Sequence, residues 1–159
     1  MQYRIVERNA FQVIGINREF PYDVENGGLQ AYQNFWTEIH ENGTVDQLND
    51  LKEGETKGLL GIWAEVNKEE NRMDYYVAAE YNGNVPHGLK KIDFPAAKWV
   101  IFEIKGPFPS AIATMWERIY SEWFPSSGYV PSSIKPFEVY LDTDATNPNT
   151  YNEIWVAIK

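Results

Sequence analysis

Glu138 and Tyr140 are the residues of this chain whose types and spacing best suit ligand chemistry. Residues 137–141 alternate in polarity, which predicts a strand with Glu138 and Tyr140 on one face and three apolar residues on the other. We expect Trp155, on the next strand, to share the face of Glu138. A lone carboxylate among aromatic rings suits an organic cation, because it pairs with the charge while the rings offer their π faces. The alternative is a solvated outer face, the commoner position for a strand glutamate.

Several other residues are candidates for the same site. Glu153 shares the predicted face of Trp155, where it is either a second acid of the site or a rim residue. Trp63 lies two residues from a glycine. Either this small residue leaves a slot beside the Trp63 ring for a flat ligand, or Trp63 packs in the core. Tyr75 and Tyr76 point to opposite faces of one strand, so only one of them can line the site. The predicted ligand-binding residues are Glu138, Tyr140, Trp155, Glu153, Trp63, Tyr75, Tyr76 and Phe102.

The composition excludes several classes of catalytic and metal site. The chain has no cysteine, which rules out disulfides, thiolate catalysis and thiolate metal sites. Its 2 histidines, His40 and His87, are far apart in sequence and offer little basis for a zinc site or a Ser-His-Asp triad. We therefore expect neither a metal nor a cofactor. The 6 Trp, 10 Tyr and 8 Phe indicate a large aromatic core or an aromatic-lined cavity instead.

The charge and hydropathy of the chain limit its partners. A formal net charge of −9 would repel a phosphate backbone, so we expect no direct binding of nucleic acid. No apolar run approaches the roughly 20 residues that span a bilayer, and residues 1–8 lack the apolar region of a signal peptide. We expect a soluble cytoplasmic protein with a small-molecule partner and no membrane contact.

The periodicities predict the order strand, helix, strand, strand, repeated once. This order indicates an α+β fold of duplicated β-α-β-β units, with an antiparallel sheet, helices on one side and a ligand cleft at the central seam. No linker separates the halves, so residues 1–159 are predicted to be a single domain. Residues 3–6 and 11–16 are either one interrupted edge strand or two strands. The other predicted strands are 56–66, 73–81, 97–104, 137–141 and 153–158, and the predicted helices are 29–41 and 110–123, with a short helical turn at 45–51.

The order and spacing of several short motifs resemble a known family. The motifs lie at residues 11–15, 58–62, 95–102, 105–107, 116–129, 136–140 and 153–158. Together they resemble the GyrI-like small-molecule-binding domain, the effector-binding domain of AraC-type and MerR-type transcription activators. The resemblance implies two halves around a cleft that binds diverse, often cationic and aromatic compounds. It also implies that Glu138 is the electrostatic anchor, accompanied by Glu153 and Trp155. Because the sequence begins directly in this domain, we expect no attached DNA-binding helix-turn-helix.

Three functional hypotheses follow. The first is a free-standing binding protein for hydrophobic small molecules, cationic aromatic compounds among them, that acts in sensing or sequestration. The second is a hydrolase of electrophilic small molecules in which Glu138 activates water as a general base. The third is a protein-binding regulator such as a topoisomerase inhibitor, although the acidic residues are spread along the chain rather than clustered.

Overall fold

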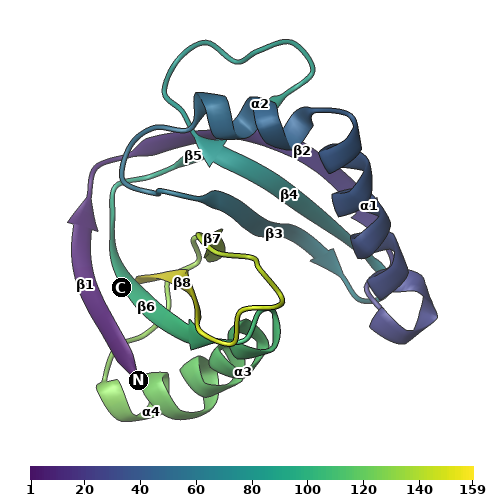
Figure 1. Ribbon diagram of the computed structural model, residues 1–159. Coiled ribbons are helices and arrows are strands. Elements are labelled where there is room, and N and C mark those ends of the chain that lie inside the picture. Colours follow the sequence, from purple (N-terminus) through teal and green to yellow (C-terminus); the bar gives the residue numbers. More distant parts are fainter. The chain divides into compact units, whose positions relative to one another are not determined.

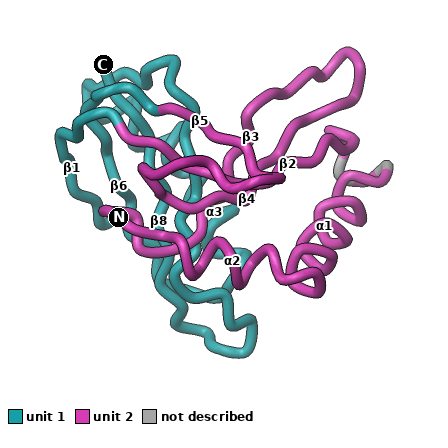
Figure 2. The backbone as a smooth tube through the Cα atoms, turned by 90° about the horizontal axis from the view of Figure 1, so that it is seen from above, with its two compact units in different colours: residues 1–10, 94–159 teal, residues 11–93 magenta. Residues whose placement is uncertain are grey.

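The chain divides into two compact units, and each contains the strand, helix, strand, strand order that the sequence predicts. The computed structural model describes residues 1–159, apart from the side chains of Val24 and Asn26. Unit 1 comprises Met1–Ala10 and Phe94–Lys159, and unit 2 comprises Phe11–Asp93 (Figure 2). The fold belongs to the α+β class, as predicted. The ligand cleft at the seam of the two halves stays a prediction.

Unit 1 is an antiparallel sheet with helices packed on one of its faces. Its strands lie in the order β1-β6-β8-β7, and α3 packs on β6 and β8. Trp123, in the helical segment after α3, contacts Tyr3 and Phe102 with ring centroids 5.2 and 5.1 Å away. The elements of unit 1 are β1 (Gln2–Arg8), β6 (Ala97–Gly106), α3 (Ser110–Arg118), η2 (Ile119–Trp123), α4 (Phe124–Ser127), β7 (Phe137–Tyr140) and β8 (Thr150–Ile158).

Unit 2 repeats this arrangement with different side chains. Its strands lie in the order β5-β2-β4-β3. Both units thus have the same arrangement. An edge strand, β1 or β5, is followed in space by the first, then the third and then the second strand of the β-α-β-β segment. Helices α1 and α2 pack on β2 and β4, respectively (Figure 1). The elements are β2 (Phe11–Phe20), η1 (Val24–Gly28), α1 (Leu29–Glu41), α2 (Thr44–Leu51), β3 (Leu59–Asn67), β4 (Arg72–Glu80) and β5 (Lys90–Phe94), whose last residue belongs to unit 1.

The first two strands separate into different units. β1 pairs with β6 in unit 1, whereas β2 pairs with β4 in unit 2. Of the two alternatives drawn from the sequence, two strands are therefore correct and one interrupted strand is wrong. Ala10 is the last residue of the N-terminal segment of unit 1, and unit 2 begins at Phe11.

The helix predicted to end before Pro125 continues through this residue. α3 passes into the π-helical turn η2 and then into α4, where Pro125 stands in the first turn. Proline lacks the N–H that a continuous helix would use at this position, and the turn directly before it is π-helical, where the α-helical hydrogen-bond pattern is already interrupted. Gly128 ends α4 with a φ of 81°, a left-handed conformation that glycine adopts without a steric penalty.

Strand β5 was not predicted from the sequence. Three of its five residues, Lys90, Lys91 and Asp93, are charged, so the segment lacks the composition of a buried strand. It lies at the edge of the unit 2 strands, next to β2. Charged residues are common on edge strands, where they discourage pairing with other chains.

Gly15, in the middle of β2, permits a close approach of β2 to β4. A Cβ at this position would lie 2.2 Å from the carbonyl oxygen of Val77 and 2.7 Å from Ala78, the residue paired with Gly15. We expect Gly15→Ala to lower the free energy of unfolding by about 1–3 kcal/mol, the usual cost of overpacking. Urea denaturation would measure this loss. Glu19→Ala, at the exposed end of β2, should change stability by no more than about 0.5 kcal/mol, and an equal effect of both substitutions would contradict the packing described.

Candidate functional site

Glu138 is a buried acid on the helix-covered face of unit 1. The pairing of β7 with β8 aligns Glu138 with Ile154, and Ile154 pairs in turn with Phe102 on β6. Glu138 is buried, with a relative solvent exposure of only 8%. Its two oxygens accept hydrogen bonds from aromatic residues: Trp116 Nε1 donates to Oε2 at 2.7 Å and the Tyr140 hydroxyl donates to Oε1 at 2.5 Å. Two aromatic side chains, Trp116 and Tyr140, therefore contact the Glu138 carboxyl group.

The surroundings of Glu138 oppose its negative charge. Burial raises the pKa of the Glu138 carboxyl, and the hydrogen bonds from Tyr140 and Trp116 offset part of this rise. Both donors are neutral, and within the described part of the chain no Lys, Arg or His forms an ion pair with Glu138. The carboxylate is thus desolvated and has hydrogen-bond donors, but among the described residues it has no compensating cation.

Aromatic rings extend from Glu138 toward the surface of unit 1. Trp116 is half-buried and stacks on Tyr120, with ring centroids 6.3 Å apart and an interplanar angle of 9°. Tyr120 is 46% exposed. The other donor ring, Tyr140, meets Phe108 edge-on, with ring centroids 6.2 Å apart. The segment before α3, α3 itself and η2 therefore supply the aromatic rings that surround Trp116 and Tyr140.

Trp155 does not share the face of Glu138, so this part of the sequence prediction is wrong. The register pairs Trp155 with Phe137, whereas Glu138 is opposite Ile154. Directly opposite residues of an antiparallel pair point to the same side, and a shift of one residue reverses the face. Trp155 is therefore on the other face, where it stacks on Phe137 at 5.4 Å and meets Trp99 at 5.9 Å.

Glu153 lies on the face of Trp155, as predicted, and has strong partners there. It accepts hydrogen bonds from Arg4 and Tyr151 at Oε2 and from Trp155 Nε1 at Oε1, all at 3.1 Å. The Tyr151 hydroxyl also contacts Glu103 at 3.0 Å. Burial and these carboxylates raise the pKa of Tyr151 to about 12. Unlike Glu138, Glu153 is paired with an arginine.

The unit 2 candidates also divide between two faces. Trp63 pairs with Tyr75, and their ring centroids are 4.2 Å apart. Tyr75 is fully buried and contacts Tyr32 and Phe35 of α1, which identifies this face as the helix-covered one. Tyr76 is opposite Ile62 on the other face and is half-buried. The last candidate, Phe102, is a buried core residue of unit 1.

Three residues that form hydrogen bonds with Glu138 or Glu153 were not predicted from the sequence. Trp116 has the helical spacing of a core residue, and this spacing concealed the role of its indole N–H as a donor to Glu138. Arg4 and Tyr151 lie on strands where alternation gives their face but not their partners. Their contact with Glu153 depends on the pairing of β1 and β8 with β6, which the sequence does not specify.

The structure offers little for a metal ion. Across the described residues, no three His, Cys, Asp or Glu side chains come together in a group that could hold a metal ion. None of the described helices is long and apolar enough to cross a bilayer.

Comparison with known proteins connects this geometry to a family. The model of the GyrI-like small molecule binding domain matches residues 1–159. The chain is 28% identical over 163 residues to the transcriptional regulator BrlR of Pseudomonas aeruginosa, a match that covers 99% of this chain and 56% of BrlR. The chain thus spans about half the length of this curated relative.

Solved structures share the fold. The crystal structure of a putative bacterial transcription regulation protein from Staphylococcus aureus MU50 has a TM-score of 0.76 and 24% identity, with 100% of this chain and 99% of that chain covered. SAV2435 bound to tetraphenylphosphonium has a TM-score of 0.82 and 22% identity, with 100% and 94% covered. The whole-length match to the family model shows that this chain belongs to the GyrI-like small-molecule-binding domain family.

Proposed function

We propose that this chain binds hydrophobic cationic aromatic molecules, with Glu138 as the electrostatic anchor. The observation that carries the proposal is the burial of Glu138 with neutral hydrogen-bond donors and no cationic partner among the described residues. A buried charge without a counter-charge is costly, so the site favours either a proton or a cation on the carboxyl group. A bound organic cation would satisfy this carboxylate.

The aromatic side chains supply the second part of the recognition. Trp116 and Tyr140 contact Glu138 directly, and Tyr120 and Phe108 pack on these two rings. Cations are attracted to such π faces, most strongly where water is excluded. The related protein SAV2435, which binds tetraphenylphosphonium, supports a lipophilic cation as the ligand class.

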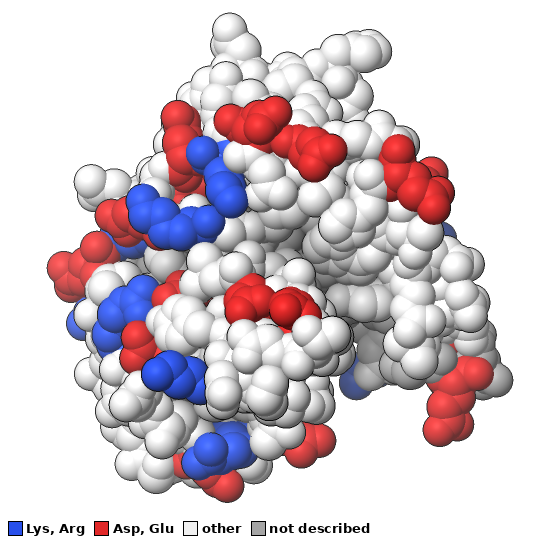
Figure 3. Space-filling model, viewed as in Figure 1, with Lys and Arg blue, Asp and Glu red and all other residues white. Residues whose placement is uncertain are grey.

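Binding is favoured over hydrolysis by the contacts of the carboxylate. Each oxygen of Glu138 already accepts one short hydrogen bond, and these two donors stabilise the charged carboxylate and so reduce its strength as a base. Glu138 as general base of a hydrolase therefore remains the weaker hypothesis. A protein-binding regulator that mimics nucleic acid also has less support, because acidic side chains form separate patches on the face in Figure 3.

The biological use that we propose is sensing or sequestration of the bound compound. Sensing is supported by the similarity to a transcriptional regulator, of which this chain matches about half. A binding domain of this kind would transmit ligand occupancy to another protein or segment, whereas sequestration would need only affinity.

The proposal predicts that removing the charge of Glu138 weakens cations selectively. Calorimetry with tetraphenylphosphonium should show a loss of roughly 1–3 kcal/mol in Glu138→Gln, the scale of the attraction between two unit charges a few ångströms apart near a protein surface. Neutral triphenylphosphine oxide, which also presents phenyl rings, should barely change. Glu117→Gln removes the same charge from an exposed position of α3 and should leave both affinities unchanged. Equal losses for the two compounds, with an unaltered circular dichroism spectrum, would contradict an electrostatic anchor.

A further inference from the structure

An aromatic-lined cavity lies in unit 2, at the turn end of the β3–β4 hairpin. It has a volume of about 810 Å³, within the range of small-molecule sites. Its apolar lining comes from Tyr22, Trp63, Val66 and Met73. Tyr22 and Val66 are large apolar residues that are 38% and 46% exposed. We call this space the hairpin cavity.

The walls of the hairpin cavity are held together by Asn71. This residue has a φ of 52°, a left-handed conformation that asparagine tolerates in turns. Its side-chain oxygen accepts the N–H of Asp23 at 2.7 Å, and its carbonyl oxygen accepts the N–H of Tyr22 at 3.2 Å. These bonds tie the segment after β2 to the β3–β4 turn, so the two sides of the cavity are fixed relative to each other.

Trp63 is equally well fixed. Its ring stacks on Tyr32 of α1 at 6.0 Å with an interplanar angle of 24°, and it contacts Tyr75 at 4.2 Å. A rigid, partly exposed indole in a cavity offers a flat ligand a stacking surface without a large loss of side-chain entropy.

The charged residues that line the cavity carry a net negative charge. Asp23 and Glu25 line the cavity together with Lys68. The Lys68 ammonium lies 5.5 Å from the centre of the Tyr22 ring, a cation–π contact that shows how this ring face accommodates a cation.

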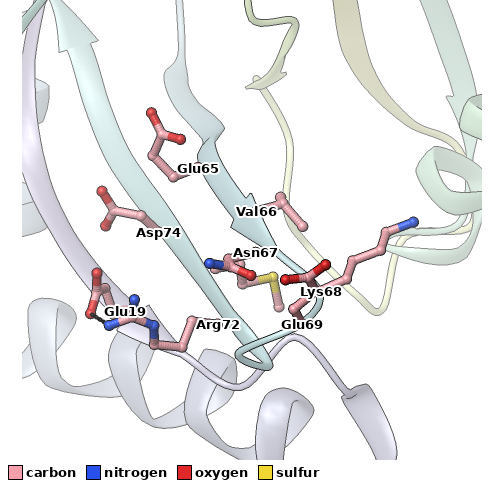
Figure 4. Close-up of a pocket in the computed structure, with 9 residues that line it drawn as sticks. Glu19, Glu65, Val66, Asn67, Lys68, Glu69, Arg72 and Asp74 are labelled. Atoms are coloured by element: carbon pink, nitrogen blue, oxygen red, sulfur yellow. Dashed lines mark ion pairs between the residues drawn. The ribbon is translucent and has the colours of Figure 1, made fainter.

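A neighbouring cavity adds further acidic side chains, which lie on the face of the strands opposite to Trp63 and Tyr75. It has a volume of about 450 Å³ and shares Val66, Lys68 and Met73 with the hairpin cavity. The strand register aligns Glu19, Asp74 and Glu65 in one row across β2, β4 and β3 (Figure 4). Of the described residues that line the two cavities, six are acidic and two are basic. Fields of this sign raise the local concentration of cations.

We infer that the hairpin cavity binds a planar aromatic cation, with its rings against Trp63 and Tyr22 and its charge directed toward Asp23 and Glu25. Such a site goes beyond the proposed function, because every residue that forms it belongs to unit 2 whereas Glu138 belongs to unit 1. The chain would then hold two ligand molecules through different residues.

The test uses proflavine, a planar aromatic cation, and the Glu138→Gln protein, so that the unit 1 anchor does not contribute. Nitrogen–proton NMR spectra during a titration should show saturable shifts of the Trp63 indole N–H and the Asn71 amide. Val66→Arg places a cation at the rim and should weaken this binding by roughly tenfold or more, equivalent to about 1.4 kcal/mol. Val130→Arg is a matched substitution of a valine in unit 1 that is 53% exposed, and it should have no effect.

A separate experiment tests whether the hairpin cavity prefers a positive charge. Glu25→Gln should weaken proflavine by about threefold, as expected for a solvent-exposed charge pair, and should leave neutral anthracene-9-methanol unchanged. The inference is overturned if proflavine causes no saturable shift at Trp63, or if Val66→Arg and Val130→Arg weaken binding equally. Failure of the Glu138 site would leave these results unaffected.

Discussion

Trp155→Ala is expected to lower the free energy of unfolding by about 3–5 kcal/mol, as for other buried tryptophans. Trp155 is 2% exposed, stacks on Phe137 and contacts Trp99. Its truncation would leave a cavity between these rings and remove the indole donor of Glu153. Urea denaturation followed by far-ultraviolet circular dichroism would measure the loss.

The size of this effect separates a core residue from a ligand-lining one. Trp155→Phe keeps most of the packing and loses the N–H, so it should be clearly less destabilising than Trp155→Ala. A loss below about 1 kcal/mol in Trp155→Ala, a value typical of sites outside the core, would contradict the role described and would restore Trp155 as a candidate ligand contact.

Glu138→Gln is expected to increase stability at neutral pH, and the gain should depend on pH. The pKa of Glu138 is raised in the folded state above its ordinary value of 4.5, so the folded protein holds this proton more tightly than the unfolded chain does. The contribution of the protonated carboxyl is therefore complete below pH 4.5 and is lost as the pH rises through the folded-state pKa. Each unit of pKa elevation corresponds to about 1.4 kcal/mol.

Unfolding of both proteins in urea between pH 4 and pH 8 would measure this dependence. The two stabilities should be similar at the acidic end, where the glutamine amide resembles the protonated carboxyl in shape. The variant should be the more stable protein at the alkaline end. Glu117→Gln should follow the wild type throughout, and a variant advantage that does not change with pH would contradict the elevated pKa.

The fold was largely predictable from local sequence patterns. Helical spacing gave α1 with its observed bounds, Leu29–Glu41, and alternation located the strands of both units. The misses arise where a second effect competes with the pattern. Proline usually terminates a helix, but this helical run continues through Pro125 directly after the π-helical turn η2, and the charges of β5 conceal an edge strand.

The candidate site was predictable only in part, because alternation along one strand does not fix its register with the next. It correctly put Glu138 with Tyr140, since both lie on β7. It put Trp155 on the wrong face, since the pairing of β7 with β8 decides that relation. The donor Trp116 comes from a helix, and its contact with Glu138 depends on how α3 packs on the sheet.

The most direct test of the account is the pKa of the Glu138 carboxyl, measured by carbon-detected NMR in the free protein and with saturating tetraphenylphosphonium. In the free protein, burial should raise this pKa above 4.5. Bound cation should lower it, because a nearby positive charge favours the ionised carboxylate. An ordinary pKa in the free protein, or the same pKa with and without tetraphenylphosphonium, would contradict the assignment of Glu138 as the anchor of a cationic ligand.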